Sequence, residues 1–114
     1  MSRNAVECMT AADLLFDAAR LLADRDVLPA AVLVRAAVET HLRRRLAELG
    51  LQPRRPSMFD RLKSLKQAGA ITADQAREIR RWVATGNQAA HNWAVPPCDV
   101  AEALAGAAQL VEEE

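Results

Sequence analysis

The sequence predicts an all-α protein, folded as a bundle of four or five helices that run up and down. The chain holds 24 alanines and 14 leucines, but only two phenylalanines, two tryptophans and no tyrosine. Alanine and leucine favour helices, whereas sheets favour β-branched and aromatic side chains. Apolar residues also recur at offsets of three and four, which place them on one helix face. Because 114 residues make one domain of ordinary size, we expect a single helical domain over residues 1–114.

The first helix is expected to end around residues 24–26. Thr10 and Asp13 have the spacing of a capping box, in which two side chains satisfy exposed backbone N–H groups of the first turn. The helical pattern also extends back to about Asn4, so the sequence leaves the start of this helix open.

The longest helix is expected to begin after Asp26 and to run to Leu49. Asp26 is a suitable N-cap, Pro29 is tolerated in a first turn, and Gly50 is typical of the residue that follows a helix. Offsets of three and four place one stripe of residues on a single face of this helix. The stripe consists of Leu28, Ala31, Val32, Arg35, Val38, Glu39, Leu42, Leu46 and Leu49.

Two further helices are predicted by their N-caps, after a basic connection that contains two prolines at residues 51–56. Ser57 with Asp60 is expected to cap the third helix, and Thr72 with Gln75 is expected to cap the fourth. The N-caps therefore divide the second half of the chain into short, separately capped segments.

The last helix is predicted after Pro96 and Pro97, which break the chain between two helical patterns. Ahead of them, Gly86 is expected to kink or end the fourth helix. The last helix carries an apolar stripe and ends in an acidic tail. Its stripe consists of Val100, Ala103, Leu104, Ala107 and Val111.

The charges cancel over the whole chain but are unevenly distributed along it. Residues 35–81 carry twelve Arg or Lys against five Asp or Glu, whereas residues 1–34 carry three against five and residues 82–114 carry none against five. A basic centre can attract phosphate, and the guanidinium of arginine, used thirteen times against two lysines, suits phosphate contacts. The alternative is that the arginines reflect the coding bias of the genome and lie solvated on helix surfaces.

Two charged residues interrupt the apolar stripe of the longest helix. Arg35 and Glu39 stand four residues apart, so they can pair and reduce the cost of lying beside a core. One interpretation is a structural ion pair at the edge of the bundle, and the other is a polar pocket that binds a ligand. His41 lies one position off the stripe, and we expect it to face solvent with the three arginines that follow it.

The segment RRWVATGNQAAHNW, which begins at Arg80 and Arg81, holds the residues most suited to chemistry. Asn87 and His91 are four apart and share a helix face, and His91 is the one candidate acid or base near neutral pH. Arg80 lies on nearly the same line, but about 16 Å from His91 along a straight helix. Only a kink at Gly86 or a second subunit would bring Arg80 and His91 together.

The two cysteines, Cys8 and Cys98, are too few and too far apart in sequence for a disulfide framework or a metal cluster. No signal peptide and no apolar run of about 20 residues is present. We therefore expect a complete, cytoplasmic protein that binds no membrane, with no metal site and no cofactor.

In its order of motifs, the chain resembles the HEPN superfamily (higher eukaryotes and prokaryotes nucleotide-binding), and in particular an uncharacterised branch of it. The resemblance rests on VLVRAAVETHLRRRLAELG, which carries an Arg-x-x-x-Glu at Arg35 and Glu39, and on Gly-Asn-x-x-Ala-His, which ends at His91. It covers nearly the whole chain. It implies an up-and-down bundle of four or five helices, usually dimeric, with the polar motif at or near the dimer interface.

The resemblance also bears on catalysis. Active HEPN members are metal-independent ribonucleases with an Arg-Asn-x-x-x-His motif, in which the histidine assists the 2′-hydroxyl or the leaving group and the arginine stabilises the phosphate. Asn87 and His91 match this motif, but Gly86 stands where the motif has its arginine. Loss of a transition-state cation costs orders of magnitude in rate. The resemblance thus implies a noncatalytic relative, unless Arg35, Arg80 or Arg81 takes over.

Three hypotheses for the function follow. The first is a module that binds RNA or a nucleotide through Arg35, Glu39, Arg80, Arg81, Asn87 and His91, in a bacterial defence or toxin–antitoxin system that supplies a protein partner. The second is a degenerate ribonuclease with Asn87 and His91 as its catalytic residues. The third is an assembly protein in which the motif residues only hold helices together.

Overall fold

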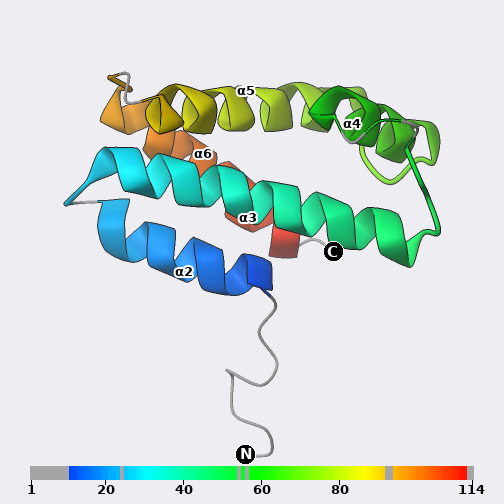
Figure 1. Cartoon of the computed structure of the whole chain (residues 1–114), viewed down its shortest axis with the longest axis horizontal. Coiled ribbons are helices and arrows are strands. Elements are labelled where there is room, and N and C mark those ends of the chain that lie inside the picture. Colours follow the sequence, from blue (N-terminus) through cyan, green and yellow to red (C-terminus); the bar gives the residue numbers. More distant parts are fainter. Residues whose placement is uncertain (1–10, 24, 54, 56, 92–93, 113–114) are drawn as a thin grey trace, which may run out of the picture.

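The computed structural model describes residues 11–23, 25–53, 55, 57–91 and 94–112, and these ranges hold five α-helices and no strand (Figure 1). The helices are α2 (Ala11–Ala23), α3 (Val27–Glu48), α4 (Met58–Gln67), α5 (Ala73–Ala90) and α6 (Pro97–Glu112). The predicted all-α fold is thereby confirmed. None of these helices is both long enough and apolar enough to cross a membrane.

The four longer helices alternate in direction, and the short α4 lies at one end of the bundle, between the end of α3 and the start of α5 (Figure 1). The helix α3 is central, because it packs against α2, α5 and α6 along its length and against α4 near its end. The molecule therefore has two distinct ends. One holds α4, and the other holds the end of α5 and the start of α6.

Local capping chemistry explains where α4 and α5 begin. Ser57 accepts a hydrogen bond from the backbone N–H of Asp60 at 3.1 Å, as predicted. Thr72 and Gln75 form the complete predicted capping box, with side-chain contacts of 2.8 and 3.0 Å to each other's backbone N–H groups. Asp26 is the N-cap of α3, but its side chain makes no capping hydrogen bond.

The ends of the predicted helices are close to those observed. Gly50 follows α3 with a φ of 68°, in the left-handed region that glycine adopts without strain. Helix α6 starts at Pro97, at the break that the two prolines predict. The suggested helix start near Asn4, the suggested cap at Thr10, and Cys8 lie outside the described residues.

The burial of α3 differs from the single predicted stripe. Ala31, Val38 and Leu42 are buried as expected. A second, adjacent face is also buried, because α3 is surrounded by other helices rather than packed on one side. The expectation that His41 faces solvent is wrong, since this residue is only 1% exposed. The second buried face consists of Ala30, Val34, Ala37 and His41.

Gly86 neither ends nor interrupts α5, which continues as a helix to Ala90. Instead, Gly86 is buried where α5 crosses α3. A Cβ at this position would lie 2.4 Å from the Cβ of Arg35 and 3.0 Å from the carbonyl oxygen of Ala31. Only glycine therefore lets the two backbones approach this closely. Gly106 on α6 makes room for a side chain instead, since an added Cβ would meet the ring of Trp82 at 2.4 Å.

Candidate functional site

The structure brings together three of the predicted site residues where α3 crosses α5. Arg35 donates a hydrogen bond through Nη1 to the side-chain oxygen of Asn87 at 2.7 Å. Its Nε lies 3.5 Å from Oε1 of Glu39, within ion-pair distance. We call Arg35, Glu39 and Asn87 the α3–α5 polar cluster. The close approach at Gly86 positions this cluster, because it brings the Cβ of Arg35 directly against the α5 backbone.

The polar cluster is only partly shielded from water. The side chains of Arg35 and Glu39 retain 30% and 26% of their exposure, and Asn87 is exposed. The cation therefore has a carboxylate and an amide oxygen as partners within the protein. This arrangement is typical of an ion pair at the edge of a bundle, the structural interpretation that the sequence left open.

His91 stands at the end of α5 rather than inside the polar cluster. It is the C-cap residue, it is exposed, and its backbone N–H donates to the carbonyl oxygen of Asn87 at 3.2 Å. Since α5 is continuous between Arg80 and Ala90, Arg80 and His91 stay about 16 Å apart along its axis. The neighbouring Asn92 and Trp93 lie outside the described residues.

The two predicted arginines at the start of the motif have separate environments. Arg81 lies 3.4 Å from Glu78 one turn earlier and 3.0 Å from Glu102 on α6, so two carboxylates compensate its charge. Arg80 is exposed and faces a cavity between α5 and α4. Within a single chain, the predicted binding residues are therefore not all brought together. Arg35, Glu39 and Asn87 meet at the helix crossing, whereas Arg80, Arg81 and His91 lie apart from it.

A second group of polar residues, of which only Arg80 belongs to the predicted site, surrounds α4. Several other arginines of the described chain pair with carboxylates, as Arg20 does with Asp17 and Arg77 with Asp74, whereas Arg25 and Arg44 do not. The cations around α4 have no such partner among the described residues. We call them the α4 basic region: Arg43, Arg55, Arg61, Lys63, Lys66 and Arg80.

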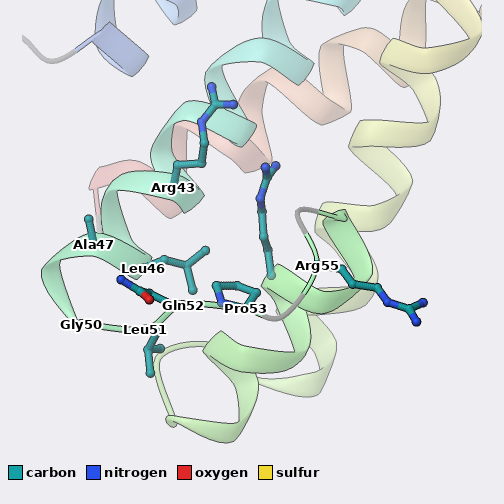
Figure 2. A pocket seen from close by; sticks show the side chains of 9 residues that line it. Arg43, Leu46, Ala47, Gly50, Leu51, Gln52, Pro53 and Arg55 are labelled. Atoms are coloured by element: carbon teal, nitrogen blue, oxygen red, sulfur yellow. The ribbon is translucent and has the colours of Figure 1, made fainter.

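One cavity of the α4 basic region lies between α3, the connection after it and α4. Its volume is about 540 Å³, and it is lined by three arginines, a glutamine and apolar or small residues, with no carboxylate among the described lining residues. Figure 2 shows Arg43 on α3 and Arg55 on the connection, with Pro53 between them in this view. Arg61 contributes from α4. The cavity is therefore open to solvent, cationic and of a size that accepts a small ligand.

A second cavity lies on the other side of α4, against α5. Its volume is about 240 Å³. Phe59, 61% exposed, forms part of its wall together with the alkyl chains of lysines, and buried Leu62 and Ala76 underlie it. Offsets of four and seven place Phe59, Lys63 and Lys66 on one face of α4, opposite Arg61. The full lining is Phe59, Leu62, Lys63, Lys66, Gln67, Ala76 and Arg80.

The sequence contained a signal for this region. The surplus of seven positive charges over residues 35–81 covers every member of the α4 basic region, whereas motif spacing predicts other site residues, Arg80 excepted. Which cations stay uncompensated depends on tertiary contacts. Glu102, for example, reaches Arg81 from 21 positions away.

Comparison with known proteins gives one result about the family. No curated protein and no solved structure matches the chain. The sequence model of a protein family, described as a domain of unknown function (DUF4145), matches residues 17–113, which include all five helices except the first turns of α2. The chain therefore belongs to the DUF4145 family.

Proposed function

We propose that this protein is a noncatalytic, HEPN-like module that binds RNA through the α4 basic region. The observation that carries the proposal is the group of six cations around α4 that have no carboxylate partner among the described residues. Uncompensated charges of one sign repel one another and destabilise a fold, so their retention on one end of the bundle favours an anionic partner. Arginine also matches phosphate geometry through its planar fork of donors.

The surroundings of three residues support the absence of catalysis. Gly86, at the position of the arginine in the ribonuclease motif, has no space for a side chain against Arg35. Arg35 itself, the nearest substitute, is held by Glu39 and Asn87. Arg81 is likewise engaged by two glutamates. Of the three substitutes, Arg35 and Arg81 are thus paired with carboxylates, and Arg80 stays about 16 Å from His91 along α5, which supports a noncatalytic module.

The test is RNA binding at several salt concentrations, measured by fluorescence anisotropy of a labelled single-stranded RNA. The double variant Arg43→Gln/Arg55→Gln removes two exposed, uncompensated arginines. Because each phosphate contact releases counterions, we expect weaker binding at every salt concentration and a slope of log affinity against log salt that is shallower by about 1.4.

The matched control is Arg20→Gln/Arg77→Gln, which removes the same charge from two exposed arginines that pair with aspartates outside the α4 basic region. We expect a much smaller loss of affinity for this control. Equal losses for the two double variants would show only a response to net charge and would contradict the proposal. Absence of RNA binding by the unmodified protein would contradict it outright.

A cleavage assay separates the proposal from the ribonuclease hypothesis. Incubation of varied RNAs with the protein and a chelator is expected to leave them intact. Cleavage that produces 2′,3′-cyclic or 3′-phosphate ends, and that disappears in His91→Ala, would establish the ribonuclease hypothesis instead.

The biological setting and the oligomeric state belong to the same proposal. The HEPN resemblance implies a bacterial defence or toxin–antitoxin system and a homodimer. Leu14 and Leu21, seven residues apart on α2, are 51% and 78% exposed, which supports an apolar contact with a second copy. Light scattering of the purified protein would check the dimer.

A further inference from the structure

The cavity between α4 and α5 combines four kinds of group in a small volume. Phe59 offers an aromatic face to solvent, and Leu62 and Ala76 form an apolar floor. Lys63, Lys66 and Arg80 form a cationic rim, and Gln67 provides an amide at the end of α4. No carboxylate is among the described residues that line the cavity.

Each of these groups matches one part of an unpaired nucleotide. An aromatic face stacks on a base, and this contact tolerates any base because every base has a π-face. An amide can donate to and accept from the hydrogen-bonding edge of a base. Lysine and arginine contact the phosphates on either side. The volume of about 240 Å³ is smaller than the roughly 300–1,000 Å³ of sites for drug-sized ligands, so it suits one ring system.

The surroundings disfavour other occupants. A second copy of the chain, related by a two-fold axis through this cavity, would bring Lys63, Lys66 and Arg80 against the same three cations. A paired duplex would present phosphates to the rim, but its bases remain stacked inside the helix and cannot reach Phe59. A single strand satisfies both the aromatic wall and the charged rim.

We infer that this cavity is a stacking site for one unpaired base of a single-stranded RNA, with Phe59 as the stacking platform and Lys63, Lys66 and Arg80 as contacts to the flanking phosphates. The inference rests on the proposed RNA-binding function and adds the class of RNA and the residue that recognises a base. It uses residues on the opposite side of α4 from Arg43, Arg55 and Arg61, so the two can be tested separately.

The experiment uses a short single-stranded RNA that carries 2-aminopurine, whose fluorescence falls when it stacks on an aromatic ring. We expect binding of the full chain to quench this probe, and Phe59→Ala to abolish the quenching and to weaken binding about 5- to 150-fold, as for loss of one stacked base. Phe59→Trp should restore both signals. Phe59 is exposed and alanine favours helices, so the variant should fold.

Two control ligands and one control variant complete the design. An oligonucleotide of the same length with abasic sites, and a duplex of the same sequence, should bind unmodified protein more weakly and be insensitive to Phe59→Ala. Gln88→Ala removes an exposed side chain near the end of α5 that is far from α4, and it should leave binding unchanged.

The possible results separate the inference from the proposed function. If Phe59→Ala binds RNA as tightly as the unmodified protein while Arg43→Gln/Arg55→Gln binds it weakly, the stacking site is wrong. RNA binding through the α4 basic region is then still supported. If the unmodified protein binds no RNA, both are wrong. If Phe59→Ala converts a dimer into a monomer by light scattering without affecting RNA binding, the cavity is a contact between copies and the inference is overturned.

Discussion

The α3–α5 polar cluster and the α4 basic region differ in whether their positive charges have partners within the protein. At the helix crossing, Arg35 has both a carboxylate and an amide as partners within 3.5 Å. Around α4, six cations have no carboxylate partner among the described residues. The first arrangement stabilises the bundle, and the second favours an anion from outside. Motif spacing identified the first region, whereas charge distribution along the chain pointed to the second.

The largest effect is expected at Gly86, a motif position whose role is in packing α5 against α3. The Cβ of Gly86→Ala would collide with the Cβ of Arg35 and the carbonyl of Ala31. Overpacking of about 3 kcal/mol would exceed a gain in helix propensity of about 1 kcal/mol, so the free energy of unfolding should fall by roughly 2 kcal/mol. Urea unfolding measures it, with exposed Gln88→Ala on the same helix as a control. A more stable Gly86→Ala would contradict the close packing.

The next effect concerns the bond between Arg35 and Asn87. A double-mutant cycle with Arg35→Ala and Asn87→Ala should give a coupling energy of about 1 kcal/mol, as expected for a hydrogen bond from a charged group that water still reaches. Both single variants should keep most of their RNA affinity, because neither residue belongs to the α4 basic region. A large loss of RNA binding without loss of stability would instead indicate that RNA binds at the α3–α5 polar cluster.

The smallest effect on stability is expected in the α4 basic region. Lys63→Gln/Lys66→Gln should change the free energy of unfolding by no more than about 0.5 kcal/mol, and in the direction of greater stability at low salt, since like charges repel less. Thermal unfolding at two salt concentrations measures this difference. If the double variant were clearly less stable, these lysines would hold the fold together and the contrast between the two regions would disappear.

Much of the fold could be predicted because its signals are local. Ser57 and the pair Thr72 and Gln75 mark their helices through contacts within three residues. The second buried face of α3 could not be predicted in this way, because His41 is buried by the helices around it. A single-stripe pattern describes a helix packed on one side only.

Part of the α3–α5 polar cluster could also be predicted, because one of its contacts is local in sequence. The four-residue spacing of Arg35 and Glu39 indicated their pairing, and their contact with Asn87 joins positions 52 residues apart. Phe59 belongs to no sequence motif, and it became a candidate only because the structure shows it exposed beside three cations. The role of Gly86 also depends on a neighbouring helix and not on its own segment.

The contact between Gly86 and Arg35 limits how this chain could acquire the Arg-Asn-x-x-x-His sequence. A change of the glycine codon alone would place a side chain where the Cβ of another residue already lies. Position 35 would have to become smaller, or α3 and α5 would have to separate, before an arginine fitted at position 86. The two positions on different helices are therefore constrained to change together, and a single substitution is expected to lose stability before any catalytic gain could be selected.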